Sequence, residues 1–85
     1  MKERLVIIYR SNREPGLYLY VDKDEDVSRT PEALLKQIGK REVVMTLALN
    51  PQRKLARTEA ITVLEAIEAQ GFYLQLPPAH ETPRP

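Results

Sequence analysis

An acidic run is the most obvious candidate for metal chemistry in this 85-residue chain: Asp22, Asp24, Glu25 and Asp26. Carboxylate oxygens bind hard cations, but a calcium-binding loop needs its ligands at fixed positions and a glycine at the sharp bend. The run contains no glycine. We therefore expect a solvated acidic loop and no bound metal.

Catalytic chemistry also has few candidate residues. A hydroxyl nucleophile needs a base within hydrogen-bond reach, but the only histidine, His80, lies in a proline-rich terminal segment. Glu65 and Glu68 are three residues apart on the predicted solvent face of a helix, where both carboxylates stay hydrated. The three glycines are scattered along the chain and form no phosphate-binding loop. We therefore expect no enzymatic activity and no cofactor.

Aromatic and amide side chains form a candidate partner surface. They alternate with apolar residues in two strand-like segments: Tyr18, Tyr20, Tyr73 and Gln75. If the helices cover only one face of a sheet, these side chains project from the other face, where tyrosine offers flat area and a hydroxyl group for recognition. The alternative is that the rings only cover the second face or pack under a helix.

Basic residues form a second candidate surface, a predicted basic patch made of Arg10, Arg13, Arg53, Lys54 and Arg57. Lys40 and Arg41 add two more cations between these loops. Cations beside exposed rings suit single-stranded nucleic acid, because phosphates pair with the cations and bases stack on the rings. The alternative is that these side chains are solvated loop residues.

Four segments have the composition of strands: residues 5–9, 17–21, 43–49 and 72–76. The first and third are apolar at consecutive positions, which is typical of strands covered on both faces, so we expect them in the middle of the sheet. The other two alternate, with their apolar residues, Leu76 included, directed inward.

Two segments have the periodicity of helices. The first begins with Thr30 as N-cap and Pro31 at the first helical position, and Gly39 ends it. The second runs from Thr58 to a stop at Gly71. The element order predicts an α+β fold with one four-stranded, largely antiparallel sheet and two helices packed on one side of it.

Length and composition predict a single domain over residues 1–76 and an extended or disordered proline-rich tail over residues 77–85. The net charge of +1 gives no overall field toward nucleic acid or anionic membrane. The chain has no cysteine and no apolar run long enough for export or a membrane span. These observations predict a cytoplasmic protein.

Several motifs in order resemble the YcgL family of small bacterial proteins: "IYRSNREPGLYLYV", "TPEALL", "RKLA" and "QGFYLQLPP". The resemblance covers residues 6–78 and departs from the family pattern at Val6, where members often carry a cysteine, and at Val27, which replaces a usual phenylalanine. It implies an α/β sandwich of helices on a small sheet, and it implies no activity, catalytic residue or cofactor.

Two functions are compatible with these observations. The first is a non-enzymatic module that binds another protein through the tyrosine face or through an exposed edge strand ending at Gln75 and Leu76. The second is binding of single-stranded RNA or DNA through the basic loops and sheet tyrosines. The oligomeric state is open.

Overall fold

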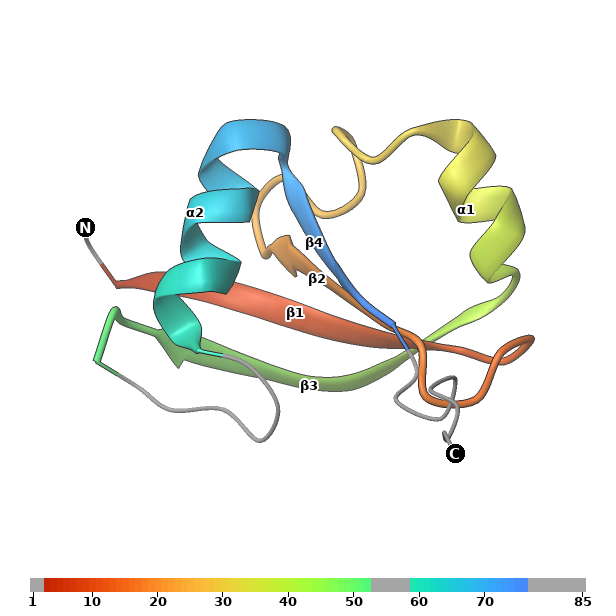
Figure 1. The fold of residues 1–85 in the computed structure, drawn as a ribbon, viewed down its shortest axis with the longest axis horizontal. Coiled ribbons are helices and arrows are strands. Elements are labelled where there is room, and N and C mark those ends of the chain that lie inside the picture. The colour runs from red at the N-terminus through yellow and green to blue at the C-terminus, as the bar shows by residue number, and fades with distance from the viewer. Residues whose placement is uncertain (1–2, 53–58, 77–85) are drawn as a thin grey trace, which may run out of the picture.

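The computed structural model describes residues 3–52 and 59–76, and the predicted tail lies outside them. The element order along the chain is the predicted one, β-β-α-β-α-β (Figure 1). The elements are β1 (Arg4–Ser11), β2 (Tyr18–Asp22), α1 (Glu32–Ile38), β3 (Arg41–Leu49), α2 (Ala60–Gln70) and β4 (Phe72–Gln75). The predicted α+β class is therefore confirmed.

The four strands form one sheet in the order β3-β1-β2-β4, and every neighbouring pair is antiparallel. The expectation that β3 lies in the middle is wrong, because β1 and β2 are the central strands and β3 is an edge. Its run of apolar residues resembles a strand covered on both faces, but only its C-terminal end is covered, where Leu49 is fully buried.

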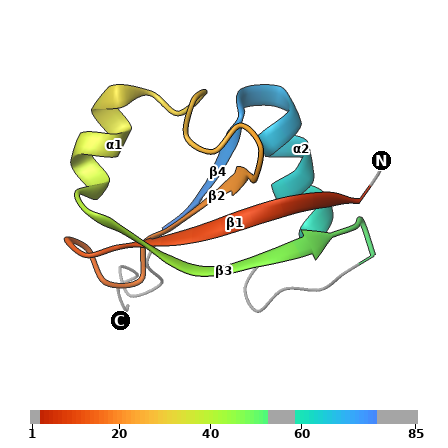
Figure 2. The same cartoon turned by 180° about the vertical axis from the view of Figure 1, so that it is seen from behind.

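The two helices pack on opposite faces of the sheet. Val6 and Ile8 of β1 pack with the apolar side of α2, whereas Ile7 and Tyr9 point to the other face and pack with Ile38 of α1. Figure 1 shows α2 crossing in front of β1, and Figure 2, from behind, shows β1 crossing in front of α2. The expectation of helices on one side only is therefore wrong, and no sheet face is left wholly open.

Helix α1 begins one residue later than predicted. Pro31 is the N-cap, with an extended ψ of 141°, and its carbonyl accepts the first helical hydrogen bond from Leu35 N at 3.1 Å. Thr30 is held instead by a turn, because its backbone N donates to Val27 O at 3.0 Å, and its hydroxyl group is buried without a cap bond. The turn fixes Thr30 before the helix starts.

Both helices end at glycines with positive φ, and each glycine is covered by an arginine from another segment. Gly39 has φ +78° and Gly71 has φ +93°. The side chain of Arg13 lies over Gly39, and that of Arg29 lies over Gly71. Both predicted helix stops are confirmed, and a glycine suits each because it has neither a steric penalty at positive φ nor a Cβ to collide with the arginine.

Candidate interaction surface

The predicted tyrosine surface is largely enclosed. Tyr20 is only 7% exposed and packs beneath α2, so its predicted position on an open face is wrong. Its ring meets that of Tyr73 edge to face at 5.5 Å, and its hydroxyl group donates to Gln75 Oε1 at 3.0 Å. The period-two alternation was predicted correctly, but α2 covers the side on which the tyrosines lie.

One row of polar side chains crosses the sheet on the α2 side near the β1–β2 loop. Glu42, Arg10, Tyr18 and Gln75 pair in that order across the four strands, and directly opposed residues share a face. Tyr18 and Gln75 are half-buried, whereas Arg10 and Glu42 are exposed. Arg10, Tyr18 and Glu42 also line a shallow hollow of about 470 Å³. The row joins members of both predicted surfaces.

Arg10 and Arg13, the two described members of the predicted basic patch, make internal contacts, and so does the neighbouring Arg41. Arg10 Nη2 pairs with Glu42 Oε1 at 2.8 Å, and Arg13 Nη1 reaches Lys36 O at the end of α1 at 3.4 Å. Arg41 is half-buried over the ring of Tyr9, with its guanidinium carbon 5.2 Å from the ring centroid. Arg10 and Arg41 are therefore held by internal contacts, whereas Arg13 is exposed and pairs with no carboxylate among the described residues.

The remaining members of the predicted basic patch, Arg53, Lys54 and Arg57, lie outside the described residues, as does His80.

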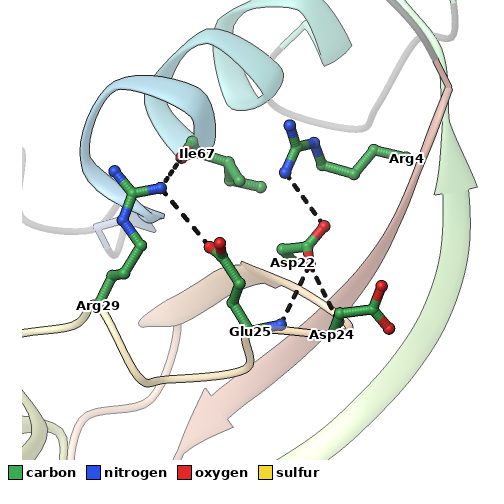
Figure 3. Close-up of polar contacts among 6 residues, drawn as sticks. All are labelled: Arg4, Asp22, Asp24, Glu25, Arg29 and Ile67. Atoms are coloured by element: carbon green, nitrogen blue, oxygen red, sulfur yellow. Dashed lines mark hydrogen bonds and ion pairs between the residues drawn. The ribbon is translucent and has the colours of Figure 1, made fainter.

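The acidic run forms a tight turn (Figure 3). Asp22 Oδ2 accepts the backbone N–H groups of Asp24 and Glu25 at 3.0 and 3.1 Å, and Asp22 Oδ1 pairs with Arg4 at 3.1 Å. Glu25 pairs with Arg29 at 3.6 Å. No group of three or more metal-binding side chains comes together within residues 3–52 and 59–76.

Tyr9 ties the start of β3 to this turn. Its hydroxyl group donates to Asp26 Oδ1 at 2.7 Å, and Arg41, the first residue of β3, lies over its ring. Burial raises the pKa of Tyr9 above its ordinary value, and the hydrogen bond to the Asp26 carboxylate raises that pKa further. The start of β3 is therefore held firmly against β1.

The middle of β3 exposes apolar side chains that sequence reasoning missed. Five consecutive residues, 42–46, are exposed, and the exposed fractions are 60% for Val43, 47% for Val44 and 48% for Met45. Large apolar residues gathered in this way on an edge strand are unusual, since edges are normally short, charged or covered. Glu42 and Thr46, which bracket the three residues, are the polar signals that could have indicated this exposure.

The backbone hydrogen bonds of β1 show which groups of β3 point outward. Lys23 N donates to Leu5 O at 2.9 Å, and Ser11 N donates to Leu17 O at 3.0 Å. Because the direction of backbone groups alternates along an antiparallel strand, the odd-numbered residues of β1 bond toward β2 and the even-numbered residues bond toward β3.

The β3 partners of those even-numbered residues therefore point inward, and Val43 and Thr46 point their backbone groups away from the sheet. A β-bulge at Val44 lies between them, because Ile8 pairs with Met45 whereas Tyr9 pairs with Val43. Ala48, the next outward residue, already makes an interaction, so within the described part of the chain the open stretch of the edge ends at Thr46.

Comparison with known proteins identifies the family to which the chain belongs. The YcgL domain model matches residues 6–78, which is most of the sequence. The chain belongs to the YcgL family. The resemblance seen in the sequence motifs is therefore confirmed.

Relatives in other bacteria support this membership. A YcgL domain-containing protein of Pseudomonas aeruginosa is 51% identical over 79 residues, which cover 93% of this chain and 81% of the relative. One from Chromohalobacter salexigens is 50% identical over 82 residues, covering 96% and 85%. One from Saccharophagus degradans is 47% identical over 78 residues, covering 92% and 86%. These names give the domain and no activity.

The family motifs map onto the described elements. The motif I-Y-R-S forms the end of β1, and Q-G-F-Y-L-Q covers the end of α2 and all of β4. Within the described residues, neither helix is long and apolar enough to cross a membrane.

Proposed function

We propose that this YcgL domain is a non-enzymatic protein-interaction module, and that its docking site is the β3 edge from Glu42 to Thr46. The observation that carries the proposal is the exposure of Val43, Val44 and Met45 at an edge of the sheet, where no other strand of residues 3–52 and 59–76 pairs with the outer side of this stretch. The absence of cysteine is compatible with a reducing compartment, and we place the module in the cytoplasm.

The exposed apolar side chains favour an added strand over a partner that sits on one sheet face. Met45 pairs with Ile8, whose side chain faces α2, whereas Val43 pairs with Tyr9, whose side chain faces α1. Val43, Val44 and Met45, which we call the apolar rim, therefore extend to both faces of the sheet. An extended segment lying along the edge contacts both faces at once and also bonds to the outward backbone groups.

The bulge at Val44 limits how long such a pairing can be. A bulge interrupts the regular ladder and twists the strand, so a partner strand pairs regularly on only one side of Val44. Bulges at edges also protect a sheet against indiscriminate pairing. The site therefore suits a short segment whose side chains, more than its backbone, supply the affinity.

The test is partner capture with two lysine variants. Val44→Lys places a charge in the middle of the proposed site. Leu76→Lys places the same charge on an apolar residue just beyond β4, which is 66% exposed and not directed inward as the sequence predicted. In chemical cross-linking in the native cell, followed by mass spectrometry, we expect the wild type and Leu76→Lys to retain a shared partner and Val44→Lys to lose it.

Thermal unfolding of the purified variants controls for damage to the fold, because substitutions of exposed residues change stability by only about 0.5 kcal/mol. Retention of every partner by Val44→Lys would end the proposal. Loss in Leu76→Lys alone would move the site to the β4 edge.

A further inference from the structure

We infer that the segment docking on β3 carries acidic side chains next to a short apolar run. This inference rests on the proposed function and adds the chemistry of the partner. Its basis is a group of exposed cations where β3 begins: Arg13, Lys36 and Lys40.

Hydrogen bonds bring these three residues to one end of the sheet. Arg13 Nη1 reaches Lys36 O at 3.4 Å, and Asn12 N donates to Lys40 O at 3.1 Å. Lys40 directly precedes the first residue of β3. The cations therefore adjoin the N-terminal end of the exposed apolar stretch.

Nearby carboxylates leave this end with a positive charge. The Glu42 carboxylate is engaged by Arg10, and Glu14 is the remaining acidic residue in the adjacent loop, residues 12–17. Among the described residues, Arg13, Lys36 and Lys40 have no carboxylate within ion-pair distance. An acidic side chain on a docked segment would pair with them, and complementary charge fixes the register and accelerates association.

A second copy of this chain fits the edge less well. Self-pairing of β3 centred on its apolar residues sets the bulge at Val44 against the same bulge in the other copy, so the ladder is interrupted in both strands. It also brings no acidic residue of β3 other than Glu42 to the cations, and Glu42 is already paired with Arg10. A different chain with apolar and acidic residues can pack on the apolar rim and also form ion pairs with the cations.

Nitrogen-15 NMR of the full chain, titrated with two synthetic peptides, tests this inference. Both peptides have a core of alternating valine and threonine. The acidic peptide has glutamates on both sides of the core, so that either strand direction can place one near Lys40, and the basic peptide has lysines instead. We expect the amide signals of residues 41–46 to move, with about tenfold tighter binding of the acidic peptide at low salt.

Two charge reversals supply the matched variants. Lys40→Glu removes the preference for the acidic peptide. Lys23→Glu makes the same change at an exposed lysine beside Leu5, at the opposite end of β1, and leaves the preference intact. Loss of the preference in both variants, or in neither, would overturn the role of Lys40 and with it the acidic partner.

The outcomes separate this inference from the proposed function. Movement of the β3 signals with equal affinity for both peptides keeps the edge as a docking site and overturns the acidic partner. No movement with either peptide overturns both. A sedimenting dimer of wild type that dissociates in Val44→Lys would identify a second copy as the occupant and overturn the inference.

Discussion

At the scale of single residues, the glycine stops were predictable and the arginines that cover them were not. A positive φ at the end of a helix is a local requirement, so Gly39 and Gly71 could be assigned from the sequence. Arg13 comes from the β1–β2 loop and Arg29 from the segment before α1, and their contacts depend on how distant parts of the chain meet. Arg13 was therefore predicted as part of a basic patch, whereas its guanidinium group reaches the end of α1.

Gly71→Ala is expected to destabilise the fold by about 2 kcal/mol, because a side chain is strained at positive φ. An added Cβ would also lie 2.3 Å from Arg29 Cβ, an atom fixed close to the backbone. Gly71→Asn separates the two causes, since asparagine tolerates a left-handed backbone better than alanine. Urea unfolding should show that Gly71→Asn is no more stable than Gly71→Ala. If Gly71→Asn instead had the full stability of the wild type, the collision with Arg29 would be unimportant.

Tyr9→Phe tests the contact that holds the start of β3. The pKa of Tyr9 is raised above 10.0 in the fold, so its contribution to the free energy of unfolding is complete below about pH 10 and is lost as the pH rises through the folded-state pKa. We expect the free energy of unfolding of the wild type to exceed that of Tyr9→Phe by roughly 1 kcal/mol near neutral pH. Urea unfolding at increasing pH should show this difference shrinking above about pH 10; a constant difference would contradict the assignment.

At the scale of elements, sequence patterns gave the type of each element but not its surroundings. The apolar runs of β1 and β3 are alike in the sequence, yet β1 is central and β3 is an edge. A strand pattern records which side chains are apolar, whereas coverage depends on where α2 packs, and α2 covers only the Leu49 end of β3. The burial of Tyr20 could not be predicted for the same reason, since alternation assigns a side chain to one face of the sheet but does not show which helix covers that face.

Helix α2 should depend on its buried face. Ile67 is fully buried in the core between α2 and the sheet, whereas Glu68, the next residue, is exposed. We expect Ile67→Ala to lower the free energy of unfolding by roughly 2–5 kcal/mol and Glu68→Ala to change it by less than about 0.5 kcal/mol. The free energies are measured by urea unfolding. Similar losses of stability in the two variants would contradict the placement of Ile67 in the core and of Glu68 at the surface.

At the scale of the whole molecule, the element order predicted the α+β class, but the strand order and the placement of helices on both faces came only from the structure. Each helix buries one face of the sheet, and the helices together leave the middle of β3 uncovered. Tyr20 of the predicted tyrosine surface is buried, and the docking site that we propose instead consists of Val43, Val44 and Met45 beside the cations at the start of β3. The candidate site is thus set by packing that no local pattern in the sequence records.

Native-state hydrogen exchange of the purified protein tests the open β3 edge most directly. The backbone N–H groups of Val43 and Thr46 point outward and should exchange almost as fast as in an unfolded chain, whereas those of Val6 and Leu19 in the central strands should exchange only with global opening. Fast exchange at Val43 and Thr46 is the predicted result. Protection there equal to that of Val6 would mean that the edge is already paired, and would contradict the account.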